Sequence, residues 1–72
     1  MERGNNEGME EIQLDSFWEN NKNGELYRVC RLVHDATNGR EGTVCVLYYR
    51  IRTGKHYVRE YNEFLKKFRR VR

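Results

Sequence analysis

The sequence predicts an all-β fold, a small β-barrel of five short strands with one short helical turn near the C-terminus. Segments rich in Val, Tyr and Leu alternate with polar turns that contain glycine. No stretch longer than about ten residues has clean helical periodicity, and proline is absent from all 72 residues. A chain of this length is one domain at most and buries only about 60% of the surface that its unfolded form exposes. We therefore expect marginal stability.

The first eleven residues are expected to be a flexible acidic leader that precedes the fold. Residues 1–11 contain four glutamates, two glycines, two asparagines and almost no apolar side chains. Such a segment cannot bury enough surface to offset the entropy of ordering it. The domain is therefore predicted over residues 12–72. Two roles stay open for the leader, a solvated tail or an acidic arm that contacts the basic body or a partner.

The first strand is predicted near residues 14–19, where Ile12, Leu14 and either Phe17 or Trp18 supply apolar side chains before the turn sequence ENNKNG. A second strand is predicted near residues 25–34, in the sequence LYRVCRLVH. Its apolar residues occupy both odd-numbered and even-numbered positions, so both faces of the strand carry them. This pattern suits a long, bent strand that is shared between two sides of a small barrel.

The third and fourth strands are predicted to form a hairpin. The polar sequence DATNGREG separates the second strand from a β-rich stretch at residues 43–51. The sequence RTGK then places Gly54 where a tight hairpin turn requires a positive φ. The return strand is predicted near residues 56–59, and three strands joined in this way form a meander.

The end of the chain is predicted to hold a helical turn at residues 61–65 and a closing strand at residues 66–71. Apolar side chains recur there at the i, i+3, i+4 and i+7 spacing of one helix face. Two helical turns are too few to be stable alone, so they must pack on the sheet. In the closing strand Phe68 and Val71 are expected to point inward. The residues expected to close one end of the barrel are Val58, Tyr61, Phe64 and Leu65.

Two sequences, WENNKNGELYRV at 18–29 and TGKHYVREYNEFLKKF at 53–68, resemble a family of short bacterial and phage domains. That family is catalogued as a domain of unknown function and typically runs GxxYxV, a variable loop, then YxxxxGxxxVRxxxxF. The resemblance covers roughly residues 18–68, which is most of the chain outside the leader, and implies an SH3-like barrel of five short strands with a helical turn before the last strand. It implies no catalytic residue. This chain departs from the family at Glu60, where members often carry proline, and in its longer, more charged loop.

The residue types give little support for catalysis or metal binding. Cys30 and Cys45 fall within predicted strands, where a cysteine is usually a small buried apolar residue, and a disulfide is the open alternative. A zinc site needs clustered ligands, whereas His34 and His56 are single and separated. Asp35 follows His34 directly, but neighbours on a strand point to opposite faces. We therefore expect no catalytic residue, no metal and no cofactor.

The charge of the chain is divided along its length. Residues 1–19 contain six acidic residues and one basic residue, whereas residues 20–72 contain thirteen basic and five acidic residues. No apolar run approaches the length of a membrane span, and none follows a basic start as in a signal peptide. The sequence therefore predicts a cytoplasmic protein with a strongly basic body and no membrane partner.

Two basic segments, one around the second hairpin and one at the C-terminal end, can be neighbours in a small barrel and form one binding face. The candidate binding residues are Arg50, Arg52, Lys55, His56, Arg59, Lys66, Lys67, Arg69 and Arg70. The candidate aromatic contacts are Tyr48, Tyr49 and Tyr57.

Protein binding is the favoured role of this face, because Tyr and Arg are frequent binding anchors. The resemblance adds the expectation of a phage or bacterial accessory protein that binds and modulates, or inhibits, a host or defence protein complex. Nucleic-acid binding is the alternative, in which cations displace counterions from a phosphate backbone and exposed rings stack on bases. The chain is expected to be a monomer or a weak homodimer, since charges near the C-terminus oppose edge pairing.

Overall fold

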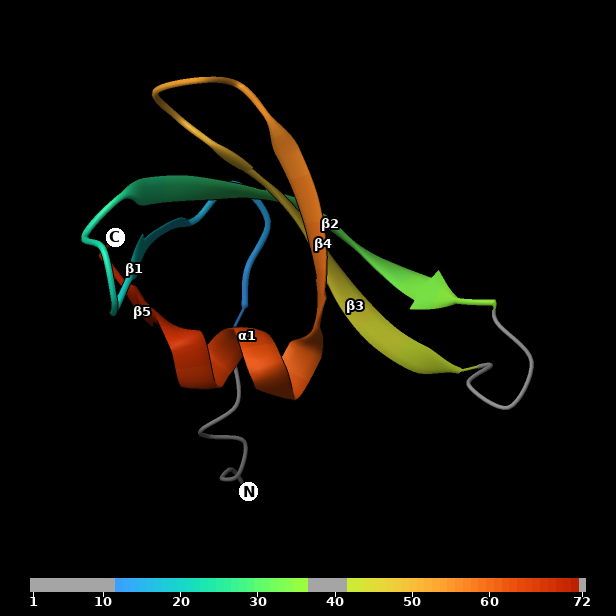
Figure 1. Ribbon diagram of the computed structural model, residues 1–72. Helices are drawn as coiled ribbons and strands as arrows, with labels where there is room; N and C mark the ends of the chain where they lie inside the picture. Colours follow the sequence, from blue (N-terminus) through green and yellow to red (C-terminus); the bar gives the residue numbers. More distant parts are fainter. Residues whose placement is uncertain (1–11, 37–41, 72) are drawn as a thin grey trace.

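The computed structural model describes residues 12–36 and 42–71, which form a five-stranded antiparallel sheet and a short helix (Figure 1). The elements, in chain order, are β1 (Phe17–Asn20), β2 (Leu26–Asp35), β3 (Thr43–Arg50), β4 (His56–Glu60), α1 (Tyr61–Lys67) and β5 (Phe68–Arg70). The sheet order is β4-β3-β2-β1-β5, so β4 and β5 are its edges. The predicted acidic leader and most of the predicted loop DATNGREG lie outside the described residues.

The five strands and the short helix confirm the predicted all-β class. Closure into a barrel is not confirmed, because no hydrogen-bonded ladder joins β4 to β5 in the described part of the chain. The bounds of β2, β3 and β4 agree with the predicted strands to within one residue at each end. The last strand is shorter than predicted, because the helix continues to Lys67 before the chain becomes extended at Phe68.

The predicted bend in the second strand is a bulge in β2. Val29 pairs with Tyr48 and Leu32 pairs with Val46, but the register shifts between Val29 and Arg31. Such a shift inserts one extra residue and moves the following side chains to the other face. Val29 and Leu32 therefore lie on the same face of the sheet although their positions differ in parity. The bulge accounts for the even-numbered Leu32, whereas its apolar neighbour Val33 lies on the opposite face.

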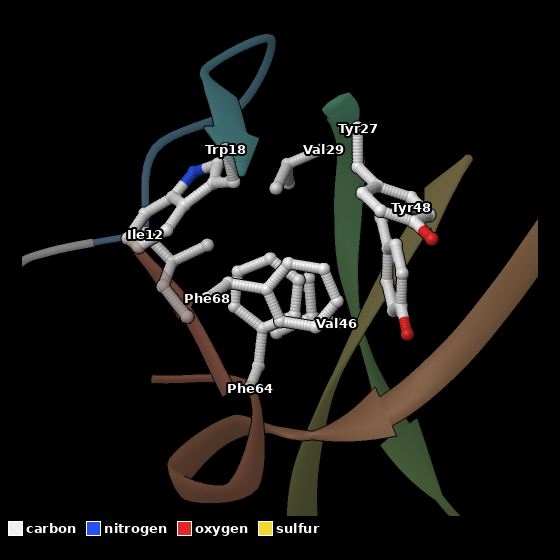
Figure 2. Packing of buried hydrophobic residues seen from close by; sticks show 8 residues of the cluster. All are labelled: Ile12, Trp18, Tyr27, Val29, Val46, Tyr48, Phe64 and Phe68. Carbon is white, nitrogen blue, oxygen red and sulfur yellow. The ribbon is translucent and has the colours of Figure 1, made fainter. Parts of the chain in front are cut away.

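The hydrophobic core lies between the inner face of the sheet and α1, and aromatic rings fill most of it (Figure 2). Phe64 stacks on Phe68 with ring centroids 4.3 Å apart and contacts Trp18 and Tyr48 edge-on at 5.1 and 5.0 Å. Trp18, and not Phe17, is the inward aromatic of β1. The buried residues of this cluster are Ile12, Trp18, Tyr27, Val29, Val46, Tyr48, Phe64 and Phe68.

Four apolar side chains predicted to be inward or to support the first strand are exposed. The expectation was wrong for Leu14, Val58, Leu65 and Val71, which are 59%, 59%, 36% and 46% exposed. Leu14 and Val71 lie outside the strands, in the segments that flank β1 and β5.

The exposure of Val58 and Leu65 follows from the side-chain repeat of the strand and of the helix in which they lie. Val58 pairs with Leu47, whereas the neighbouring Tyr57 pairs with the buried Tyr48 and packs against the core. Since successive side chains of a strand alternate, Val58 faces outward. In α1 the core-facing position belongs to Phe64, and the narrow contact of a seven-residue helix leaves Leu65 partly in solvent.

The hairpin between β3 and β4 turns on Gly54, which has a φ of 76°. Its N–H donates to the Arg50 carbonyl over 2.7 Å. A methyl group placed there would meet no heavy atom within 4 Å, so replacement costs only backbone conformational energy. The structure confirms the positive φ predicted from the sequence.

We expect Gly54→Ala to lower the free energy of unfolding by about 1–2 kcal/mol, because an L side chain is disfavoured at this φ. Gly54→Asn should cost less, since asparagine tolerates the left-handed region. Urea denaturation of the two variants and the parent chain measures the difference. Equal stabilities for Ala and Gly at this position would contradict the turn geometry.

Candidate binding groove

A basic groove runs between the two edge strands, where Arg59 of β4 reaches over Phe68 of β5 with its guanidinium carbon 5.9 Å from the ring centroid. We call it the seam groove. It consists of two hollows that share Asn20, Asn23 and Arg59. The larger hollow, the lysine pocket, has a volume of about 400 Å³. The smaller hollow, the tyrosine cleft, has a volume of about 220 Å³.

The lysine pocket is formed by the turn after β1 and the end of α1. Lys22 contributes from the turn, and Lys66 and Lys67 contribute from the last turn of the helix. Two hydrogen bonds hold these segments together, from the Asn21 N–H to the Lys67 carbonyl over 2.9 Å and from Asn21 Nδ2 to the Lys66 carbonyl over 3.2 Å. The turn therefore places Lys22 beside two lysines that are more than forty positions away in the sequence.

Asparagine side chains fix the shape of this turn. Asn20 Oδ1 accepts hydrogen bonds from the N–H groups of Lys22 and Asn23 over 2.8 and 3.2 Å. Asn23 Oδ1 accepts from the Glu25 N–H over 2.8 Å. These local bonds satisfy backbone donors that the turn leaves without strand partners. The sequence ENNKNG therefore builds one wall of the groove as well as a turn.

The tyrosine cleft is walled by three tyrosine side chains. Tyr27 and Tyr48 are only 4% and 2% exposed and meet edge-on with ring centroids 5.5 Å apart. Tyr57 stacks on Tyr48 at 5.7 Å. The hydroxyl groups of Tyr27 and Tyr48 point away from the apolar cluster (Figure 2). The rings therefore belong to the core, whereas these two hydroxyl groups belong to the cleft.

Two arginines hold these hydroxyl groups. Arg50 donates from Nε and Nη2 to the Tyr27 hydroxyl over 3.3 and 3.1 Å, and Arg59 donates from Nε to the Tyr48 hydroxyl over 3.2 Å. The hydrogen bond to Tyr27 raises the pKa of the Arg50 guanidinium, and its effect exceeds the lowering caused by burial. Arg50 therefore stays charged at any physiological pH.

Two carboxylates approach these arginines from outside the cleft lining. Glu25 Oε1 lies 4.0 Å from Arg50 Nε, and Glu63 Oε1 lies 3.7 Å from Arg59 Nη1. At these lengths the contacts are weak ion pairs and leave guanidinium N–H groups for other acceptors.

The structure brings part of the predicted binding face together in the seam groove. The predicted residues that line it are Arg50, Arg59, Lys66, Lys67, Tyr48 and Tyr57. Tyr48 is buried, so its ring is not an exposed contact and only its hydroxyl faces the cleft. The two basic segments are neighbours, as the sequence predicts, because Arg59 and Lys66 line the same pocket.

Other predicted residues lie outside the groove. Arg52 pairs with Glu25 over 2.9 Å, and Arg69 pairs with Glu19, its neighbour across β1 and β5, also over 2.9 Å. Arg70 donates to Gln13 Oε1 over 3.3 Å. Two of these arginines are therefore paired with carboxylates and the third donates to a glutamine, so they add less positive charge to a binding face than the sequence predicts.

Tyr49, Lys55 and His56 also do not line the groove. Tyr49 and His56 stack on each other at 5.2 Å on the outer face of the hairpin. The Lys55 ammonium lies 5.9 Å from the ring centroid of Tyr57. The predicted binding residues are therefore divided between two faces of the sheet.

Sequence reasoning missed Lys22, Tyr27 and the asparagines of the turn as groove residues. The asparagines were assigned to turn formation, and Tyr27 was assigned to a strand. The sequence gives no separate signal for this role, because Asn20 and Asn23 already bond to backbone groups of the turn. The position of that turn beside the end of α1 is a property of the topology.

Cys30 and Cys45 are free thiols, and Cys45 is buried as predicted whereas Cys30 is half-buried. Across residues 12–36 and 42–71, no group of three or more His, Cys, Asp or Glu side chains is placed to hold a metal ion. The same residues contain no helix of the length and apolarity that a membrane crossing requires.

Comparisons with protein-family models, curated proteins and solved structures give no match for this chain. The family resemblance described above therefore stays a prediction.

Proposed function

We propose that this chain is a small non-catalytic binding module of the SH3-like barrel type, which docks an acidic segment of a protein partner in the seam groove. Three features of the fold support the barrel type: the strand order β4-β3-β2-β1-β5, the bulged β2 that pairs on both sides, and the short helix between the two edge strands. The contact between Arg59 and Phe68 across the edges supports a sheet that curls toward closure.

The observation that carries the proposal is the charge of the groove lining. Among the described residues, five cationic side chains and no acidic side chain line the two hollows. Lys22, Lys66 and Lys67 make no ion pair with another described residue, so their charges are available to a partner. A hollow lined by charges of one sign raises the local concentration of the opposite charge and favours an acidic ligand.

The positions of the aromatic rings favour a protein partner over nucleic acid. Binding of unpaired bases combines a basic track with exposed ring faces. In this chain the rings of Tyr27 and Tyr48 are buried, and the exposed His56 ring lies on the opposite face of the hairpin. The half-buried Tyr57 ring stacks on Tyr48 and has the Lys55 ammonium 5.9 Å from its centroid. A single strand in the groove would therefore find several cations but only this one partly covered ring. A protein segment rich in Asp and Glu requires only the cations.

Within this proposal the partner is a host or defence protein complex, as the family resemblance implies, and the chain acts as an accessory protein or inhibitor. The second candidate function is contact with a nucleic-acid phosphate backbone, which the three lysines of the lysine pocket favour. The two functions differ in their response to nuclease and in the salt dependence of binding.

Charge reversal in the lysine pocket should weaken partner binding about tenfold or more while the chain stays folded. Lys67→Glu places a like charge against an acidic partner, and loss of a cation in the last helical turn costs only about 0.3–1 kcal/mol. Arg31→Glu is the matched control, because it makes the same change of net charge on the exposed outer face of β2.

Affinity capture from nuclease-treated host lysate tests this prediction. The parent chain and Arg31→Glu should recover the same stoichiometric protein, and Lys67→Glu should recover little of it. If both variants lose partner recovery equally, binding depends on the net charge of the chain and not on the groove, which contradicts the proposal. Recovery that disappears with nuclease would favour the second candidate function.

A further inference from the structure

The tyrosine hydroxyl groups of the cleft are hydrogen-bond donors toward any ligand. A guanidinium can only donate, so the hydroxyl groups of Tyr27 and Tyr48 must accept from Arg50 and Arg59. Each hydroxyl then keeps its own hydrogen for a further acceptor. No described residue accepts a hydrogen bond from either of them. Both hydroxyl groups are therefore able to donate to a ligand in the cleft.

The side chains of the two asparagines in the cleft also present hydrogen-bond donors. The side-chain oxygens of Asn20 and Asn23 accept backbone hydrogen bonds within the turn. Because backbone N–H groups require an acceptor, these bonds assign the oxygen and leave the two NH₂ groups as donors. Neither NH₂ group donates to another described residue. Both asparagines line the cleft beside Arg50 and Arg59.

The polar lining of the tyrosine cleft is therefore made of donors. It has two guanidinium groups, the phenol groups of Tyr27 and Tyr48, the half-buried Tyr57 phenol and two amide groups, and no carboxylate among the described residues lines it. A hollow of this composition favours an oxyanion, because each oxygen can accept several of these hydrogen bonds. At about 220 Å³ it holds one such group rather than a length of chain.

A phosphate monoester fits this donor set better than a carboxylate. It presents three acceptor oxygens and a charge of about −1.5 to −2 at neutral pH, whereas a carboxylate presents two oxygens and one charge. Arginine pairs bidentately with phosphate. The weak contacts of Glu25 and Glu63 leave the guanidinium groups able to make such pairs.

We infer that the tyrosine cleft anchors one phosphorylated side chain of the protein partner, while the lysine pocket holds the acidic residues beside it. The inference rests on the proposed function for the partner's class, and it adds a phosphate-selective subsite to the groove. Shared lining residues make the two hollows continuous, so one segment can occupy both.

Three peptides of one acidic sequence, with serine, glutamate or phosphoserine at the central position, test the anchor. The phosphoserine peptide should bind at least tenfold tighter than the serine peptide, with the glutamate peptide between them. In ¹H–¹⁵N spectra the Nε–H signals of Arg50 and Arg59 should shift with the phosphoserine peptide. Equal affinities for the three peptides would overturn the inference.

A matched pair of tyrosine variants locates the effect. Tyr48→Phe keeps the buried ring and removes a hydroxyl group that can donate to a ligand and that also accepts from Arg59 Nε. It should therefore weaken the phosphoserine peptide about tenfold and the serine peptide much less. Tyr49→Phe makes the same change on the opposite face and should leave all three affinities unchanged. The same response to both variants would overturn the assignment to the cleft.

Two further outcomes separate this inference from the proposed function. Partner capture that depends on Lys67 but shows no phosphate selectivity would retain the proposed function and overturn the anchor. If the peptides show phosphate selectivity that depends on the Tyr48 hydroxyl but no protein is captured from lysate, the phosphate anchor is supported and the proposed protein partner is contradicted. A 5′-phosphorylated oligonucleotide that shifts the Arg50 and Arg59 signals at lower concentration than the phosphoserine peptide would overturn the protein assignment.

Discussion

Phe64→Ala is expected to remove a large part of the free energy of unfolding. Phe64 is completely buried and contacts Phe68, Trp18 and Tyr48 through its ring. Truncation of a buried phenylalanine costs about 3–5 kcal/mol, through lost apolar burial and the cavity that remains. A chain of this size has only roughly 4–11 kcal/mol of stability. Circular dichroism during thermal unfolding should show the midpoint fall by tens of degrees, or no cooperative transition at all.

Leu65→Ala is the matched control for this prediction, because it removes an apolar side chain from the neighbouring helical position. Leu65 is 36% exposed and is not part of the buried cluster. Alanine also has the highest helix propensity, which offsets part of the lost burial. We expect a cost of about 1 kcal/mol or less. Similar losses for the two variants would show that α1 packs through a broader face than the structure indicates.

Val46→Asp is expected to abolish folding at neutral pH. Val46 is completely buried at the centre of the inner face of β3, opposite Leu32. No cationic side chain belongs to the buried cluster that surrounds it. An unpaired carboxylate in such a site costs about 3–5 kcal/mol even after relaxation, and the lost valine burial adds to this cost. Urea denaturation should find no stable native baseline.

Val58→Asp tests the same substitution on the opposite face of the sheet. Val58 is 59% exposed in the edge strand β4, so the carboxylate stays hydrated. The expected cost is at most about 1 kcal/mol, from the low strand propensity of aspartate. A large destabilisation by Val58→Asp together with tolerance of Val46→Asp would show that the inner and outer faces are reversed.

The core and the candidate site share side chains, which affects how the groove can be tested. Tyr27, Tyr48 and Phe68 belong to the buried cluster and also line the tyrosine cleft. Replacing a whole ring would therefore combine a stability effect with a binding effect. Removing only a hydroxyl group, as in Tyr48→Phe, keeps the packing of the ring and confines the change to polar contacts, including the one with Arg59. The shared rings also hold the two hydroxyl groups in place, because a close-packed core leaves its rings little freedom.

Several elements were predictable because the responsible signals are local. Strand alternation and the turn sequences ENNKNG and RTGK predicted β2, β3 and β4 to within one residue at each end. The helical spacing that starts at Tyr61 correctly predicted a helix with Phe64 at its buried centre. Its C-terminal end was less predictable, since Lys66 and Lys67 fit a helix or a strand equally well and contact with the β1–β2 turn favours the helix.

The groove was only partly predictable because its two sides come from distant segments. Sequence reasoning selected Arg50, Arg59, Lys66 and Lys67 by charge, and all four line the groove. It also selected Arg69, which the register of β1 with β5 places beside Glu19. The sequence does not show whether a carboxylate lies opposite an arginine on the neighbouring strand, because that depends on strand pairing and register.

By itself, the sequence determined the all-β class, the main strand boundaries, the basic character of the body and the aromatic composition of its core. These properties depend on residue type and on short periodicities, which are present in the chain before it folds. The tertiary structure decided which face each valine and leucine occupies, which cations are neutralised, and that an asparagine-rich turn lies against the end of α1. Those properties depend on strand register and on the order of strands in the sheet, which bring together residues that no short pattern connects.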